Sequence, residues 1–172
     1  MAENTVWPQR NTTRLKGYDY TQAGGYFFTL TVQNREHLFG EVHQGILHLS
    51  KFGLIVQQEW LRTANIRRNI ELDDFIVMPD HIHGVIFFTN PDGLEVPQKQ
   101  VRSLSRPARS LGSFIAGLKA ITTIRINELR GTPGTKVWQR NYFDRIIRDE
   151  KDLDRIREYI ETNPVRWSDD HK

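Results

Sequence analysis

The sequence contains no cysteine among its 172 residues. This absence excludes disulfide bonds, thiolate zinc sites and cysteine nucleophiles, so any metal must be held by histidine, carboxylate or amide ligands. The chain also lacks a run of about 18 apolar residues, the length that a membrane-spanning helix requires. Residues 1–16 contain no apolar segment of the kind found in export signals. We therefore expect neither export nor membrane association.

What the chain does contain is a composition typical of one folded domain. It is 38% hydrophobic and 26% charged, with a net charge of +3. The charge is uneven, because residues 99–130 alone carry a net charge of +6. Such a segment suits a surface that binds a polyanion, although a solvated basic helix face would look the same. A second basic cluster lies in a polar N-terminal arm, residues 1–22, and the rest, residues 23–172, is predicted to form one domain.

The pattern of apolar residues predicts alternating strands and helices. Serine or aspartate residues precede each helical stretch and are expected to act as N-caps. The predicted strands are 26–32, 70–78, 82–88 and 137–147, with a short strand or turn at 46–49. The predicted helices follow Ser50, Ser110 and Asp149, and they end near Asn65, Gly131 and Pro164. This order favours an α+β fold, a ferredoxin-like sandwich in which helices cover one face of an antiparallel sheet.

Two histidines, His81 and His83, lie at positions i and i+2 at the start of a predicted strand. Side chains alternate between the faces of a strand, so both imidazoles should point the same way and could form half of a metal site. The same spacing also occurs by chance on many strands, where both histidines are only structural. Tyr159 and Asn163, four residues apart, share one face of the last predicted helix. An amide oxygen at Asn163 could complete a metal site with the two histidines, or both residues could simply pack there.

Three segments of the chain are informative when taken together: FIVMPDHIHGVI from Phe75, WQRNYFDRIIR from Trp138 and YIETNPV from Tyr159. They resemble a known family, the single-tyrosine HUH transposases, and most closely its REP-associated tyrosine transposases. The first segment departs from the family pattern at Asp80, where asparagine is frequent.

The resemblance implies the HUH nuclease fold and a reaction on single-stranded DNA that contains hairpin elements. His81, His83 and Asn163 match the metal ligands of the family, and Tyr159 matches its nucleophile. The expected product is a 5′-phosphotyrosine linkage with a free 3′ hydroxyl, and the expected cofactor is magnesium or manganese. Imidazole ligands on their own would also suit zinc. A cytoplasmic location in a prokaryote is implied, and the choice between monomer and homodimer stays open.

Several alternatives remain at this point. Tyr142 is a second candidate nucleophile, but no amide side chain lies one turn from it. A relative that binds a hairpin without cutting it, or a histidine-metal hydrolase that uses water, would preserve much of the same pattern. Candidate phosphate contacts, which would position DNA without reading its sequence, are Arg102, Arg106, Arg109, Lys119 and Arg125.

Overall fold

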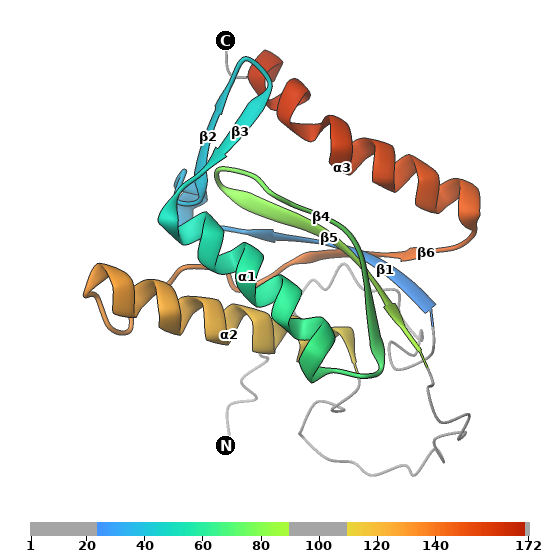
Figure 1. Ribbon diagram of the computed structural model, residues 1–172, viewed down its shortest axis with the longest axis horizontal. Coiled ribbons are helices and arrows are strands. Elements are labelled where there is room, and N and C mark those ends of the chain that lie inside the picture. Colours follow the sequence, from blue (N-terminus) through green and yellow to red (C-terminus); the bar gives the residue numbers. More distant parts are fainter. Residues whose placement is uncertain (1–23, 90–109, 171–172) are drawn as a thin grey trace, which may run out of the picture.

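The computed structural model describes residues 24–89 and 110–170 of the chain. Its centre is an antiparallel sheet with the strand order β4-β5-β1-β6. This is the order that a ferredoxin-like β-α-β-β-α-β chain produces. Two further strands, β2 and β3, pair as a separate hairpin (Figure 1). The strands are β1 (Gly24–Thr31), β2 (Gly40–His43), β3 (Ile46–Leu49), β4 (Ile70–Val77), β5 (His81–Phe88) and β6 (Phe143–Ile147).

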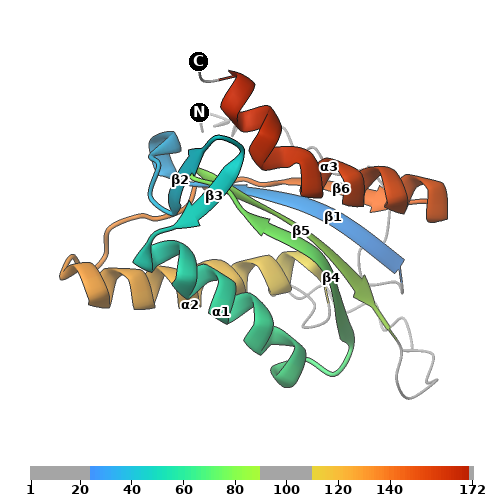
Figure 2. The same cartoon turned by 45° about the horizontal axis from the view of Figure 1, so that its top comes forward.

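The helices lie on both faces of the four-stranded sheet (Figures 1 and 2). Helices α1 (Lys51–Ile66) and α2 (Leu111–Arg130) cover one face, and α3 (Glu150–Asp170) lies over the other. Successive side chains of β1 point to opposite faces of the sheet, and this explains why the two faces pack against different helices. Phe28 packs in the larger core with α1 and α2, whereas Phe27 packs in a smaller cluster with α3. The predicted α+β sandwich is confirmed, and the last helix occupies the face opposite the first two.

The helix starts predicted from the sequence are confirmed by hydrogen bonds. The Ser50 side chain accepts bonds from the first turn of α1, and Ser110 forms a capping box with Ser113 at the start of α2. The Asp149 carboxylate accepts a bond of 2.8 Å from the backbone of Asp152 in α3. Gly131 ends α2 in the left-handed conformation, at φ 68°.

The prediction that Pro164 ends the last helix is wrong. Helix α3 continues through Pro164 to Asp170. A proline removes one backbone hydrogen bond, but packing of the following turn can compensate. Trp167 supplies such packing here, because its ring lies 5.4 Å from the ring of His37 and 5.7 Å from that of His81.

Some sequence-based predictions fall on residues that the structure does not describe. These are the basic N-terminal arm and three candidate DNA contacts, Arg102, Arg106 and Arg109. Within the described ranges, no helix has the length and apolar character needed to cross a bilayer.

Candidate active site

The two histidines of β5 converge on one point, as their spacing predicts. The Nε2 atoms of His81 and His83 lie 3.0 Å apart on the face of the sheet that carries α3. Two nitrogen ligands, each about 2.1 Å from a shared metal and at about a right angle, would be separated by about this distance. The pair therefore fits the two imidazole positions of a metal site.

Each histidine is oriented through its other ring nitrogen. The Nδ1–H of His81 donates to the Asp80 carboxylate over 2.5 Å, and Nδ1 of His83 shares a 2.8 Å hydrogen bond with the Thr29 hydroxyl. With the protons on Nδ1, both Nε2 lone pairs face the common point. Such partners of metal-binding histidines fix the tautomer and ring orientation. No local sequence pattern indicates this role of Thr29, because it depends on the pairing of β1 with β5.

Asp80 is itself held in place and charged. It is 3% exposed, and Arg35 donates to its second carboxylate oxygen over 3.3 Å. Burial raises the pKa of Asp80, but the hydrogen bond and charge of His81, together with Arg35, outweigh burial and bring this pKa below its usual value. Arg35 reaches Asp80 from a turn in which its own backbone is left-handed, at φ 54°.

Burial also determines the state of His83. Burial, followed by the charge of His81, lowers the pKa of His83 to about 3, although Asp80 acts in the opposite direction. His83 is therefore neutral near pH 7, the state in which an imidazole can ligate a metal. The same low pKa makes it a weak acceptor for the proton of a tyrosine.

Tyr159 lies beside this pair in the same chain. Its hydroxyl is 3.4 Å from Nε2 of His83, and the two ring centroids are 5.1 Å apart. The side chain is 38% exposed, so the phenol is accessible to a large substrate. The Arg166 guanidinium lies 5.6 Å from the centroid of the Tyr159 ring and adds positive charge at this point.

Asn163 lies between the two α3 residues that contact the histidines. One turn before it, Tyr159 contacts His83, and one turn after it, Trp167 contacts His81. Residues at i, i+4 and i+8 of a helix share a face, and Asn163 is 7% exposed. This spacing puts Asn163 on the same face of α3 as the two residues that contact the histidines. The contact with Trp167 exists only because the helix continues beyond the proline.

A β-bulge helps to hold α3 over the sheet. The register between β4 and β5 shifts between Leu72 and Phe75, and Asp73 lies within that shift. Bulges commonly redirect a side chain near a functional site. The Asp73 carboxylate accepts two bonds from Arg157 of α3, at 2.9 and 2.5 Å. These bonds lower the pKa of Asp73.

The glycine that follows the histidines serves the opposite face of the sheet. A Cβ on Gly84 would lie 2.8 Å from the Phe28 ring and 3.1 Å from the Trp60 ring. Glycine therefore allows the larger core to pack closely under the strand that carries the histidines.

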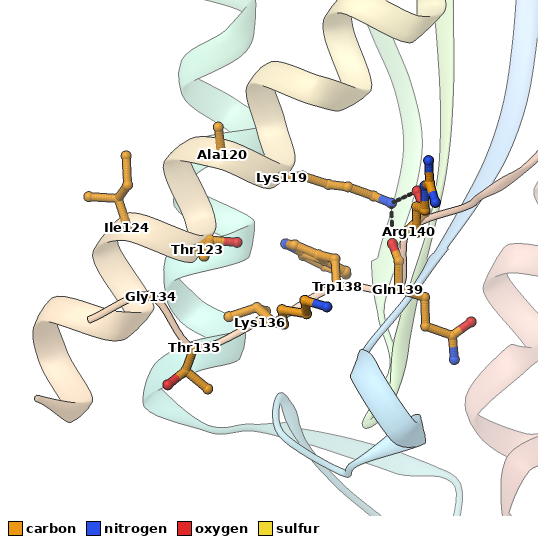
Figure 3. A pocket seen from close by; sticks show the side chains of 11 residues that line it. Lys119, Ala120, Thr123, Ile124, Gly134, Thr135, Lys136, Trp138, Gln139 and Arg140 are labelled. Carbon is orange, nitrogen blue, oxygen red and sulfur yellow. Dashed lines mark hydrogen bonds between the residues drawn. The ribbon is translucent and has the colours of Figure 1, made fainter. Parts of the chain in front are cut away.

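Lys119 and Arg125 both make bonds within the chain. The Lys119 ammonium donates to the carbonyl of Gln139 over 2.7 Å and to that of Asn141 over 3.1 Å. Figure 3 shows Lys119 reaching from α2 to this segment, beside a hollow of about 470 Å³. Arg125 donates to the buried Glu59 over 2.5 Å. Their proposed contacts with DNA stay predictions.

Tyr142, the second candidate nucleophile, lies on the other side of the sheet. It packs against the larger core, and Lys119 lies 5.8 Å from its ring centroid. The structure thus brings together Tyr159 and the two histidines, while Tyr142 belongs to the α1/α2 side.

Among the described residues, no group of three histidine, cysteine or acidic side chains could hold a metal. The amide oxygen of Asn163, which is 7% exposed, is the candidate for a third protein ligand that the sequence predicts.

Comparison with known proteins finds similar bacterial proteins. A Haemophilus influenzae protein, whose name states no function, is 34% identical over 166 residues, which span 94% of this chain and 91% of that protein. An Escherichia coli protein named REP-associated tyrosine transposase is 25% identical over 151 residues, 86% of this chain and 70% of that protein. No protein-family model matches the chain.

The fold also resembles a solved structure, that of a REP-associated tyrosine transposase bound to a REP hairpin. The TM-score is 0.60 at 19% identity, and the match covers 90% of this chain and 74% of the other. At this level of identity the similarity establishes the fold.

Proposed function

We propose that the chain, which is similar to proteins named REP-associated tyrosine transposases and shares the fold of one, belongs to their family. We further propose that it binds a DNA hairpin and cleaves and rejoins the adjacent single strand through Tyr159. The observation that carries this proposal is the 3.4 Å approach of the Tyr159 hydroxyl to Nε2 of His83. A nucleophile, two oriented imidazoles and a buried amide lie together on one face of the sheet. The solved relative bound to a hairpin supports the choice of substrate class.

In the proposed reaction, the phenolic oxygen of Tyr159 attacks the phosphorus of a phosphodiester. A bond forms between tyrosine oxygen and phosphorus, and the bond from phosphorus to the 3′ oxygen breaks. The phenol loses its proton, and the departing 3′ oxygen gains one to become a hydroxyl. One phosphodiester is exchanged for another, so the reverse reaction rejoins the strand without ATP.

The residues that would hold a divalent cation are His81, His83 and Asn163. Magnesium or manganese, if bound by these residues, would supply positive charge near the phosphate. The protein's own contribution is orientation: Asp80 and Thr29 fix the two imidazoles, and the low pKa of His83 keeps it neutral.

We propose that the nucleophile and both histidines come from one chain. Tyr159 contacts His83 of its own chain, and Trp167 of the same helix contacts His81. This arrangement supports an active site in which one chain supplies both the nucleophile and the histidines. Phosphate contacts from the basic segment, residues 99–130, would add affinity that decreases as salt concentration rises.

The test uses labelled DNA hairpins with single-stranded flanks, taken from the sequence around the gene, with magnesium or manganese. Denaturing electrophoresis should show label at the mass of the protein. This adduct should disappear with EDTA and in Tyr159→Phe, and it should persist in Tyr142→Phe. Cleavage without an adduct would indicate a hydrolase that uses water. Binding without cleavage would indicate a hairpin-binding protein, and either result would refute the proposed reaction.

A further inference from the structure

Within residues 24–89 and 110–170, only two phenylalanine, tyrosine or tryptophan side chains are more than a third exposed to solvent. They are Tyr159, at 38%, and Phe143, at 48%. Both rings lie 6.2 Å from the ring of Phe27, and both are steeply inclined to it. The nucleophile and the exposed phenylalanine are thus neighbours of the same buried ring. A single exposed apolar residue needs no explanation by itself, but this one lies beside the candidate active site.

Strand register places Phe143 in line with the histidine pair. On the α3 face, Phe143 of β6 pairs with Thr29 of β1, which in turn pairs with His83 of β5. Thr29 is the residue that orients His83. A row of side chains therefore runs from the imidazole to Phe143 across adjacent strands. Since β6 is the last strand of the sheet, this row ends at an edge.

The surface next to Phe143 carries a guanidinium group that is partly exposed. Arg145 lies two residues further along β6, so its side chain is on the same face. One of its nitrogens donates to Asp152 of α3, yet the side chain is 53% exposed. An exposed aromatic ring beside an exposed guanidinium is the combination that single-stranded nucleic acids bind, through base stacking and phosphate contacts.

We propose that Phe143 is the stacking platform for the nucleobase next to the phosphodiester that Tyr159 attacks. This inference rests on the proposed function and specifies the substrate: an unpaired nucleotide lies over the edge of β6. The base stacks on the Phe143 ring, and Arg145 faces the neighbouring phosphate. Stacking is tolerant of sequence because every base has an aromatic face.

The experiment measures binding without cleavage, in the Tyr159→Phe protein. The probe is a DNA hairpin whose single-stranded flank carries 2-aminopurine at one position at a time, because the fluorescence of this base decreases when it stacks. We expect quenching at the position adjacent to the cleaved bond. A second substitution, Phe143→Leu, retains an apolar side chain but removes the aromatic face. It should abolish the quenching and weaken binding of the flank by about 5- to 150-fold.

Two matched variants separate stacking from folding. Phe143→Tyr keeps the ring and should retain both quenching and affinity. Leu61→Ala removes an exposed apolar side chain, 61% exposed, from α1 on the opposite side of the sheet. It should change neither quantity. Thermal denaturation of every variant checks that the proteins are folded.

The proposal is overturned if Phe143→Leu binds and quenches like its parent, or if Leu61→Ala causes the same loss. Adduct formation by the protein with intact Tyr159 is measured separately. Ring-dependent quenching without an adduct would refute the proposed reaction and support the stacking site. If an adduct forms, but Phe143→Leu changes neither its formation nor the binding of the DNA flank, the stacking site is refuted and the proposed reaction is not.

Discussion

The two faces of the four-stranded sheet are built from the same strands but with different side chains. Toward α1 and α2, the strands contribute large apolar residues such as Phe28 and Leu30, and neither is exposed. Toward α3, the apolar cluster is small, and the same strands contribute Thr29, His81 and His83. Burial on the first face stabilises the fold, which allows the second face to carry the polar groups that we propose act in the reaction.

This division predicts that substitutions on the α1/α2 face affect stability and that substitutions on the α3 face affect metal binding and reaction. The largest stability effect is expected at Trp60 of α1, which is 2% exposed and stacks on Phe75 with centroids 4.3 Å apart. Trp60→Ala should lower the free energy of unfolding by about 3–5 kcal/mol, because it leaves a cavity. Urea denaturation measures the loss.

Leu61→Ala, at the next position of the same helix, is the matched control. Its side chain is 61% exposed, so the unfolding free energy should change by no more than about 0.5 kcal/mol. A loss at Leu61 equal to that at Trp60 would mean that the outer surface of α1 is covered by something other than solvent.

The next effect concerns the α3 face, where Asp80 orients His81. Asp80→Ala removes this partner and should raise the metal concentration needed for half-maximal adduct formation by about 10- to 100-fold. Asp80→Asn should have a smaller effect, because its amide oxygen can accept the same bond from Nδ1–H. The measurement is a manganese titration of adduct formation. An unchanged titration in Asp80→Ala would show that His81 does not depend on Asp80.

A smaller effect is expected at Ser50, the N-cap of α1 on the stabilising side. The Ser50 hydroxyl oxygen accepts bonds of 3.2 Å from the backbone N–H groups of Phe52 and Gly53. Ser50→Ala should cost about 1 kcal/mol in the free energy of unfolding. The rate of adduct formation per folded molecule should be unchanged. A fall in that rate would show that α1 influences the chemistry as well as the stability.

The smallest effect depends on pH and concerns the link between α3 and β4. The bond from Arg157 lowers the pKa of Asp73 in the folded state. The stability that this pair contributes is therefore complete above about pH 4 and is lost as pH falls through the lowered pKa. Asp73→Asn should remove that part of the acid dependence. Denaturation of both proteins from about pH 5 to pH 2 tests this, and parallel curves would contradict it.

Local rules were sufficient to predict much of the fold. Alternation with a period of two residues identified the strand on which His81 and His83 lie, and it correctly placed both imidazoles on one face. Short polar side chains identified the helix starts at Ser50, Ser110 and Asp149. These signals depend on residues close together in the chain, so they can be read without tertiary information.

Features that depend on tertiary contacts were not predictable in this way. The local preference against helix before proline gave the wrong end for α3, because contacts of Trp167 with His37 and His81 lie beyond the proline. The strand β2 is four residues long and gave no clear period. The role of Thr29 depends on its pairing with His83 in another strand. Asp80 was noted as a departure from the family pattern, but its bond to His81 became visible only in the structure.

The most direct test of the central claim is to identify the tyrosine that becomes bound to DNA. The adduct is digested with a protease and a nuclease, and the peptide that retains a nucleotide is sequenced by mass spectrometry. We expect the nucleotide to be attached to Tyr159, on the face that carries the histidine pair. Attachment to Tyr142, on the α1/α2 face, would contradict it.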